Sequence, residues 1–335
     1  MKRMNKWERV EAALHGAEVD RIPISLWKHY HLQDRSPGQL AEVTLALYRQ
    51  FDIDLIKLTP SGLYPIQDWG ATIQFGRDDD FLPLAVKPVI SSADQWETLP
   101  KLDVHKGVLR RELETIHHVA AGLKGRAPFM MSLFSPLTIA YKLCGDKVSG
   151  ERVVGWMRES PRQLHAGLTV IRDVVIEYAA ACLQAGASGI FFATQMATTN
   201  LMTREEFKEF GVAYDLPVLE SLIGKSRVTM LHVCKQNLMF DLTAQYPVDV
   251  INWAAFTSWT TLADARRMTD KPLAGGLSLE TLLNATEKDV VAEARQAIAQ
   301  VGRKGFILAP DCVIKGPTPD ANLAAARQVA EETTA

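Results

Sequence analysis

Short apolar segments alternate with longer amphipathic segments along most of the chain. Eight of the short segments are six or seven residues long and nearly free of charge, which is typical of parallel strands covered on both faces. The sequence predicts these strands over residues 21–27, 54–59, 128–134, 188–194, 228–233, 249–254, 271–276 and 305–311.

Helical periodicity fills the stretches between the predicted strands. Ser36 and Gln39 flank Pro37 as a capping box does, and Thr203 with Glu206 repeats the pattern. The predicted helices cover residues 5–16, 36–51, 106–124, 136–144, 149–185 with a break near Pro161, 203–222, 236–246, 260–269, 286–302 and 319–333. Strands alternating with helices indicate a parallel sheet with helical crossovers.

Eight such units favour an α/β fold that closes into a (β/α)8 barrel, the TIM barrel. No glycine-rich dinucleotide fingerprint follows a predicted strand, which weakens the case for an open doubly wound sheet. We expect one domain over residues 1–335. Residues 69–75 and 82–90 are predicted to form a small hairpin-like β insertion within it, near 69–90.

Composition narrows the classes of function. The chain has 335 residues, 47% of them hydrophobic, so it can bury a large core. Its net charge of -2 gives no reason to expect nucleic acid as a partner. No apolar run approaches about 18 residues, and the first residues lack a hydrophobic signal core, so we expect no membrane span and a cytoplasmic location. Four cysteines in such a chain favour a metal or catalytic role for some of them over a disulfide framework.

The candidate chemistry lies at the carboxyl ends of the predicted strands, where barrel enzymes carry their active sites. His232 and Cys234 end one strand and share a face, because side chains alternate along a strand. Cys312 ends another strand, 78 residues later. One imidazole and two thiolates would bind zinc with an open fourth position, whereas a lone His-x-Cys pair is more often a buried structural pair.

Six further residues lie at predicted strand ends and could contact a substrate. Trp27, Tyr64 and Trp253 are candidates for apolar pocket walls. His29, Lys57 and Gln195 are candidates for orienting the polar end of a substrate. The alternatives are exposure to solvent for His29 and a lysine that extends to the surface for Lys57.

The ligand set favours one kind of chemistry. Zinc lowers the pKa of a thiol that binds it, and sulfur-rich ligation leaves the bound thiolate nucleophilic. Water activation usually needs histidine-rich or carboxylate ligation and a general base, and no such base adjoins these residues in the sequence. Alkyl transfer to sulfur is therefore the preferred reaction.

The chain resembles the uroporphyrinogen decarboxylase superfamily over nearly its full length. The matching segments are Glu42–Leu45, Ser135–Ala140, Asp249–Trp253 and Asp311–Asn322. Within it, the chain is similar to the zinc-dependent methyltransferases that take a methyl group from a methylated corrinoid to coenzyme M or a related thiol. The pattern that carries this is His232, Cys234 and Cys312 followed by Thr318, Pro319 and Asn322. The resemblance implies that the first three are the zinc ligands.

Two alternatives to a methyltransferase stay open. A decarboxylase of porphyrinogen-like substrates would share the fold, but residues 24–30 contain no arginine to bind an anionic tetrapyrrole and residues 59–61 contain no aspartate. A non-catalytic corrinoid- or metal-binding partner is the other. Lys235, where the methyltransferases commonly have glycine, and residues 273–278 depart from their pattern.

The resemblance also implies the partners. The methyl donor would be a methylcobamide on a separate corrinoid protein, because the chain has no Asp-x-His-x-x-Gly cobalamin segment. The acceptor would be a small thiol such as coenzyme M or homocysteine, with a folate as another option. A homodimer is one assembly open to the chain.

Overall fold

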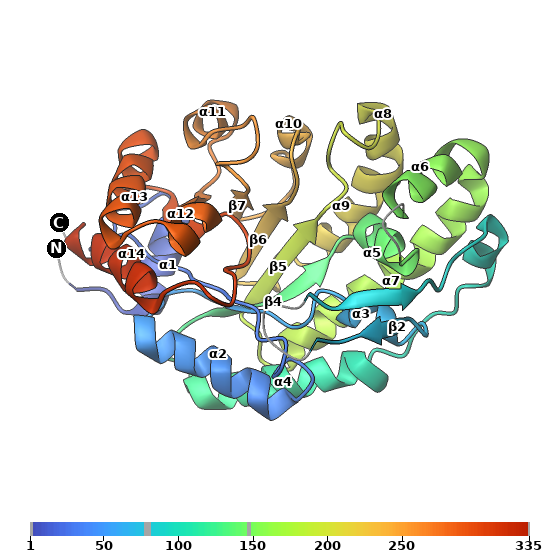
Figure 1. The fold of residues 1–335 in the computed structure, drawn as a ribbon, viewed down its shortest axis with the longest axis horizontal. Coiled ribbons are helices and arrows are strands. Elements are labelled where there is room, and N and C mark those ends of the chain that lie inside the picture. The colour runs from blue at the N-terminus through green and yellow to red at the C-terminus, as the bar shows by residue number, and fades with distance from the viewer. Residues whose placement is uncertain (1–2, 77–81, 146–148, 334–335) are drawn as a thin grey trace.

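A parallel sheet of seven strands forms the centre of the molecule. The computed structural model describes residues 3–76, 82–145 and 149–333. The strands pair in the order in which they occur in the chain: β1 (Ile56–Leu58), β4 (Phe129–Phe134), β5 (Gly189–Thr194), β6 (Val228–Val233), β7 (Val250–Trp253), β8 (Leu273–Leu277) and β9 (Phe306–Pro310). Figure 1 shows the helices ranged around the outside of this curved sheet. The prediction of an α/β fold with a parallel sheet is confirmed.

The first predicted strand, residues 21–27, is not a continuous strand. Ile24 forms a single parallel bridge with Leu308 of β9, where the Ser25 N–H donates to the Leu308 carbonyl at 2.9 Å. The Ile24 N–H donates to the Asp54 carboxylate at 3.0 Å, and Pro23 has no N–H. These two residues cannot continue a ladder, so the prediction of a full strand here is wrong.

A buried ion-pair network holds this segment against the start of β1. Asp54, which is fully buried, accepts hydrogen bonds from Arg21 Nη1 at 2.6 Å and from Arg9 Nη1 at 2.7 Å. Arg9 lies on α1 (Lys6–Leu14) and also pairs with Asp20. The network therefore ties α1, the segment around Ile24 and β1 together at the amino end of the sheet.

Helices connect the strands. They are α2 (Pro37–Phe51), α3 (Tyr64–Gln67), α4 (Gly107–Leu123), α5 (Pro136–Leu143), α6 (Ser149–Glu159), α7 (Pro161–Gln184), α8 (Arg204–Phe207), α9 (Ala213–Glu220), α10 (Phe240–Thr243), α11 (Leu262–Met268), α12 (Leu279–Asn284), α13 (Glu287–Val301) and α14 (Asp320–Glu332), with a 3-10 helix η1 (Ala93–Thr98) and a π-helix η2 (Lys208–Val212). None of the helices in the described ranges is long and apolar enough to span a membrane.

Most predicted helices are present, with two corrections. The predicted helix over 236–246 shrinks to α10, because Lys235 and Asn237 have φ angles of 101° and 50°, outside the helical region. The capping box at Thr203 and Glu206 forms, whereas Ser36 makes no side-chain hydrogen bond to α2.

Alternating side chains of the strands face two different layers. Phe191 and Met230 belong to an inner cluster enclosed by the curved sheet, which also contains Trp27. Leu231 and Ile251 belong to the larger cluster between the sheet and the helices. Because side chains alternate along β6 and β7, His232 and Asn252 point to the inner face of the sheet.

A small antiparallel sheet lies apart from the main one. It consists of β2 (Thr72–Gln74) and β3 (Leu84–Lys87), within the region where a hairpin-like pair was predicted. Residues 77–81 of that prediction lie outside the described ranges. Leu84 and Val86 of β3 are each 52% exposed.

Candidate metal centre

The predicted triad comes together at the carboxyl ends of the strands. His232 is the fifth residue of β6, Cys234 follows β6 directly, and Cys312 is the second residue after β9. One imidazole nitrogen and the two sulfur atoms all lie within 4.8 Å of one another. Within the described part of the chain, no other group of three histidine, cysteine, aspartate or glutamate residues has this spacing.

Asn252 orients the imidazole of His232. The two residues face each other in the register of β6 and β7, and His232 Nδ1 lies 2.6 Å from Asn252 Oδ1. The amide nitrogen of Asn252 donates to the carbonyls of Ala274 and Pro310, at 2.9 and 3.1 Å, so its oxygen must be the atom that faces His232. Nδ1 therefore carries the proton, and the lone pair of Nε2 is free to bind a metal.

The two cysteines form a coupled pair. A hydrogen bond from the Cys234 thiol holds the pKa of Cys312 well below its usual range. The same contact raises the pKa of Cys234. The pair thus favours one thiolate, and a divalent cation would stabilise a second.

The donor set fits a tetrahedral zinc ion. Bonds of about 2.0 Å to nitrogen and 2.3 Å to sulfur would place the ligand atoms about 3.5 to 3.8 Å apart, within the observed limit of 4.8 Å. An imidazole with a free Nε2 and two cysteine sulfur atoms are ligands that zinc prefers. Three protein ligands would leave one position of a tetrahedral ion for a substrate.

Asp311 supports the turn that carries Cys312. Its Oδ2 accepts the backbone N–H of Phe256 at 3.1 Å, which joins the loop after β7 to the turn after β9. Burial raises the pKa of Asp311 to about 8, with contributions from Glu293 and the Cys312 thiolate.

A cavity of about 240 Å³ opens directly over the two cysteines. It has room for a small organic molecule. Its walls come from the ends of several strands and include Lys235, Ala254, Ser278 and Glu280.

Trp27 and Lys57 lie in the inner layer enclosed by the curved sheet, beside His232. The ammonium of Lys57 is 4.5 Å from the ring centroid of Phe191 and 5.7 Å from that of Trp27. Phe191 in turn stacks on His232, with ring centroids 5.3 Å apart. The structure therefore brings two of the six predicted substrate residues next to the triad.

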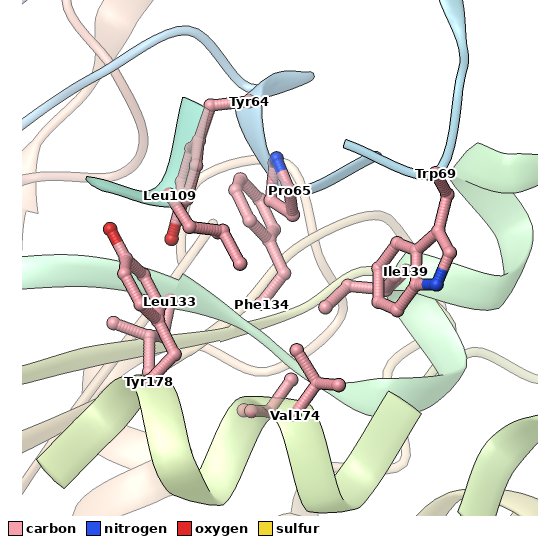
Figure 2. A pocket seen from close by; sticks show the side chains of 10 residues that line it. Tyr64, Pro65, Trp69, Leu109, Leu133, Phe134, Ile139, Val174 and Tyr178 are labelled. Atoms are coloured by element: carbon pink, nitrogen blue, oxygen red, sulfur yellow. The ribbon is translucent and has the colours of Figure 1, made fainter. Parts of the chain in front are cut away.

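Tyr64 and Trp253 lie in the outer layer, between the sheet and the helices. Tyr64 donates to the carbonyl of Ser132 at 2.8 Å and lines an apolar cavity of about 20 Å³, shown in Figure 2. That volume holds about one water molecule and no thiol substrate. Trp253 donates to the carbonyl of Thr260 at 2.8 Å and packs on Phe240. The structure does not bring these two residues to the triad.

His29 and Gln195 follow the segment around Ile24 and β5, respectively. His29 stacks on His31 at 4.8 Å, and burial lowers its pKa well below the ordinary value, with further lowering by Lys57 and Lys142. Gln195 lines two adjoining cavities of about 380 and 510 Å³, the second of which also contains Lys142. Gln195 therefore adjoins space that a ligand could occupy.

Three residues beside the triad had no role assigned from the sequence: Asn252, Phe191 and Lys142. The role of Asn252 depends on the register of β6 against β7, and that of Phe191 on its place in the inner layer. The apolar pattern of a strand reveals neither its register nor which face a given side chain occupies. Lys142 lies on α5, and no sequence motif places this helix near the triad.

The fold and the site define a class of protein: α/β proteins with a His-x-Cys and a distal Cys at the carboxyl ends of a curved parallel sheet. The family model for uroporphyrinogen decarboxylase (URO-D) matches residues 5–333, and the chain belongs to this family. The resemblance predicted from the sequence is confirmed.

Relatives in the family have two kinds of activity. The methylcobamide:CoM methyltransferase MtaA of Methanosarcina barkeri is 24% identical over 338 residues, which cover 95% of each chain. The uroporphyrinogen decarboxylase of Actinobacillus pleuropneumoniae is 25% identical over 277 residues, which cover 80% of this chain and 75% of the relative. A solved methyltransferase from Methanosarcina mazei superposes with a TM-score of 0.86 and 22% identity, covering 99% of this chain and 100% of that one, so it shares the fold.

Proposed function

We propose that this chain is a zinc-dependent methyltransferase that moves a methyl group from a methylated corrinoid to a small thiol. The observation that carries the proposal is the meeting of His232, Cys234 and Cys312 within 4.8 Å beneath a cavity. Alignment along nearly the whole chain with a methylcobamide:CoM methyltransferase supports the donor and the kind of acceptor.

The protein's own residues would prepare the site for a metal. His232 Nε2, Cys234 and Cys312 would hold the zinc, and Asn252 fixes the tautomer that leaves Nε2 free. When bound, zinc would stabilise the thiolate form of an acceptor thiol and so keep it nucleophilic at neutral pH. The cavity over the cysteines would direct that sulfur toward the donor.

The transfer itself is a displacement on carbon. The sulfur of the acceptor forms a bond to the methyl carbon while the bond between that carbon and the corrinoid cobalt breaks. The electron pair of the broken bond stays with the corrinoid, and the thiol proton passes to solvent. No residue of the chain needs to form a covalent intermediate.

The finer features of the assignment are part of the same proposal. The bridges of Ile24 and Lys28 to the β9 side support an eighth position in a closed (β/α)8 barrel that forms one domain. We propose a small thiol over a folate as acceptor, because two cysteine ligands suit sulfur. The corrinoid would be carried by a separate protein, and the location would be the cytoplasm. Decarboxylation is less well supported, since residues 24–30 offer no arginine to an anionic tetrapyrrole.

Removal of the metal tests the proposal. We expect purified protein to carry about one zinc per chain and to methylate 2-mercaptoethanesulfonate from methylcobalamin. After dialysis against dipicolinate the rate is expected to fall by more than about 100-fold, and zinc, but not magnesium, is expected to restore it. Circular dichroism checks that the metal-free protein stays folded. Full activity in folded protein without metal would refute the proposal.

A further inference from the structure

The turn that leads from the segment around Ile24 into α2 contains buried polar atoms without partners. Asp34 is 1% exposed, yet neither oxygen of its carboxylate has a hydrogen-bond partner in the described ranges. Nδ1 of His31, which is 5% exposed, and Oε1 of Gln33 have none either. Buried polar groups are almost always satisfied, so four such atoms in residues 31–34 indicate a ligand-binding site.

The backbone of this turn brings His31 and Asp34 together. The carbonyl of Tyr30 accepts the backbone N–H groups of Gln33 at 2.9 Å and of Asp34 at 2.8 Å, so the chain makes one helical turn here. Residues three positions apart lie on the same side of such a turn. His31 Nδ1 is 3.5 Å from Asp34 Oδ2, which is longer than an N–H···O hydrogen bond of about 2.7 to 3.2 Å.

The separation of these two atoms suits two ligands of one cation. Bonds of about 2.1 to 2.2 Å to an imidazole nitrogen and a carboxylate oxygen at adjacent positions place the two atoms about 3.0 to 3.6 Å apart. Carboxylate and amide oxygens with a single imidazole and no thiolate suit an oxygen-rich ion such as Mn²⁺ better than the sulfur-rich triad does. The turn and the triad therefore offer different donor sets.

The charges around the turn also favour a cation. Glu112 of α4 is fully buried, and burial raises its pKa to about 7, with a contribution in the same direction from Asp34. Arg111 donates to Glu112 at 2.6 Å and offsets one of these two carboxylates. Among the residues described, His31 alone forms an ion pair with Asp34. A buried carboxylate is costly without a well-aligned partner, and a bound cation would supply that partner.

We infer that His31 and Asp34 bind a divalent cation of the manganese or magnesium type, at a site separate from the triad. Gln33 Oε1 is the third candidate ligand, and water completes the coordination. The cation fixes the turn, and it positions His29 through the stacking of His31 on His29 at 4.8 Å. This inference does not depend on the proposed function, because it concerns other residues and a harder ion.

Binding of Mn²⁺ tests the inference. The protein is first loaded with zinc so that the triad is occupied, and free Mn²⁺ is then counted by electron paramagnetic resonance. We expect about one Mn²⁺ per chain, with spin-echo modulation from the nitrogen of one imidazole. Bound Mn²⁺ is also expected to raise the midpoint of thermal unfolding, because it binds the folded chain only.

Two variants and one control locate the ion. Asp34→Asn and His31→Gln are each expected to weaken Mn²⁺ binding by at least about 10-fold, and His31→Gln to remove the nitrogen modulation. Either variant suffices if the other does not fold, and both should keep the zinc of the triad. Asp215→Asn is the matched control: Asp215 is fully buried, one of its oxygens accepts from the Tyr246 hydroxyl at 2.8 Å, and the other has no partner among the residues described.

The control separates a built site from the loss of any buried carboxylate. We expect Asp215→Asn to bind Mn²⁺ as wild type does. The inference is overturned if zinc-loaded wild type binds no Mn²⁺, if Asp34→Asn and His31→Gln bind it as tightly as wild type, or if Asp215→Asn weakens binding to the same extent as they do. The first result would identify the contact between His31 and Asp34 as an ion pair alone.

Discussion

Cys312→Ser is expected to abolish both zinc binding and thiol methylation. A serine hydroxyl is a poor zinc ligand at neutral pH, and the remaining imidazole and thiol are too few to retain the ion. The fall in activity should exceed about 100-fold, the upper end of what changes around metal ligands usually cause. Zinc is measured by atomic absorption, and activity by the methylation of 2-mercaptoethanesulfonate.

Cys144→Ser is the matched control for this variant. Cys144 is buried, and its thiol donates to the carbonyl of Ala140 at 3.3 Å, a bond that a serine hydroxyl can retain. We expect this variant to keep its zinc and its activity. If Cys312→Ser folded, kept about one zinc per chain and stayed active, the assignment of Cys312 as a ligand would be wrong.

Asn252→Ala is expected to weaken zinc binding and methylation by about 10- to 100-fold, with all three ligands still present. The substitution removes the acceptor of the His232 Nδ1 proton, so the imidazole can take the other tautomer and turn away. It also leaves the carbonyls of Ala274 and Pro310 without their donor, which should destabilise the fold by about 1–3 kcal/mol per unsatisfied group. Zinc affinity is measured by competition with a chromogenic chelator.

Asn322→Ala separates the two effects. Asn322 is buried and its amide nitrogen donates to two backbone carbonyls, those of Leu282 and Ala285, at 2.9 and 3.0 Å, without contacting a histidine. Both variants should lower the midpoint of thermal unfolding. Only Asn252→Ala should lower zinc affinity, and equal zinc affinity in the two variants would show that Asn252 has a purely structural role.

The pattern of apolar segments predicted much of the sheet, because buried parallel strands differ sharply from the helices around them. Seven of the eight predicted strands formed. The segment around Ile24 did not, since Asp54 takes its N–H. That contact depends on a residue 30 positions away, which periodicity along the chain does not reveal. The predicted helix after β6 failed for a local reason, the positive φ angles of Lys235 and Asn237.

The site was predictable where it depended on spacing and strand ends. His232 and Cys234 share a face of one strand, and Cys312 meets them because parallel strands present their carboxyl ends on one rim. The face of the sheet to which each side chain points was harder to predict. Trp253 ends a strand, as His232 nearly does, but its side chain points to the opposite face of the sheet and contacts Phe240. Position at a strand end therefore identifies candidate residues, and the alternation of side chains along the strand decides on which face of the sheet each one lies.

X-ray absorption at the zinc edge, recorded before and after addition of 2-mercaptoethanesulfonate, tests the central claim most directly. The account predicts two sulfur scatterers at about 2.3 Å and one imidazole nitrogen at about 2.0 Å, with a third sulfur when the thiol is added. An unchanged sulfur count on addition of thiol, or a zinc ion without two cysteine ligands, would contradict it.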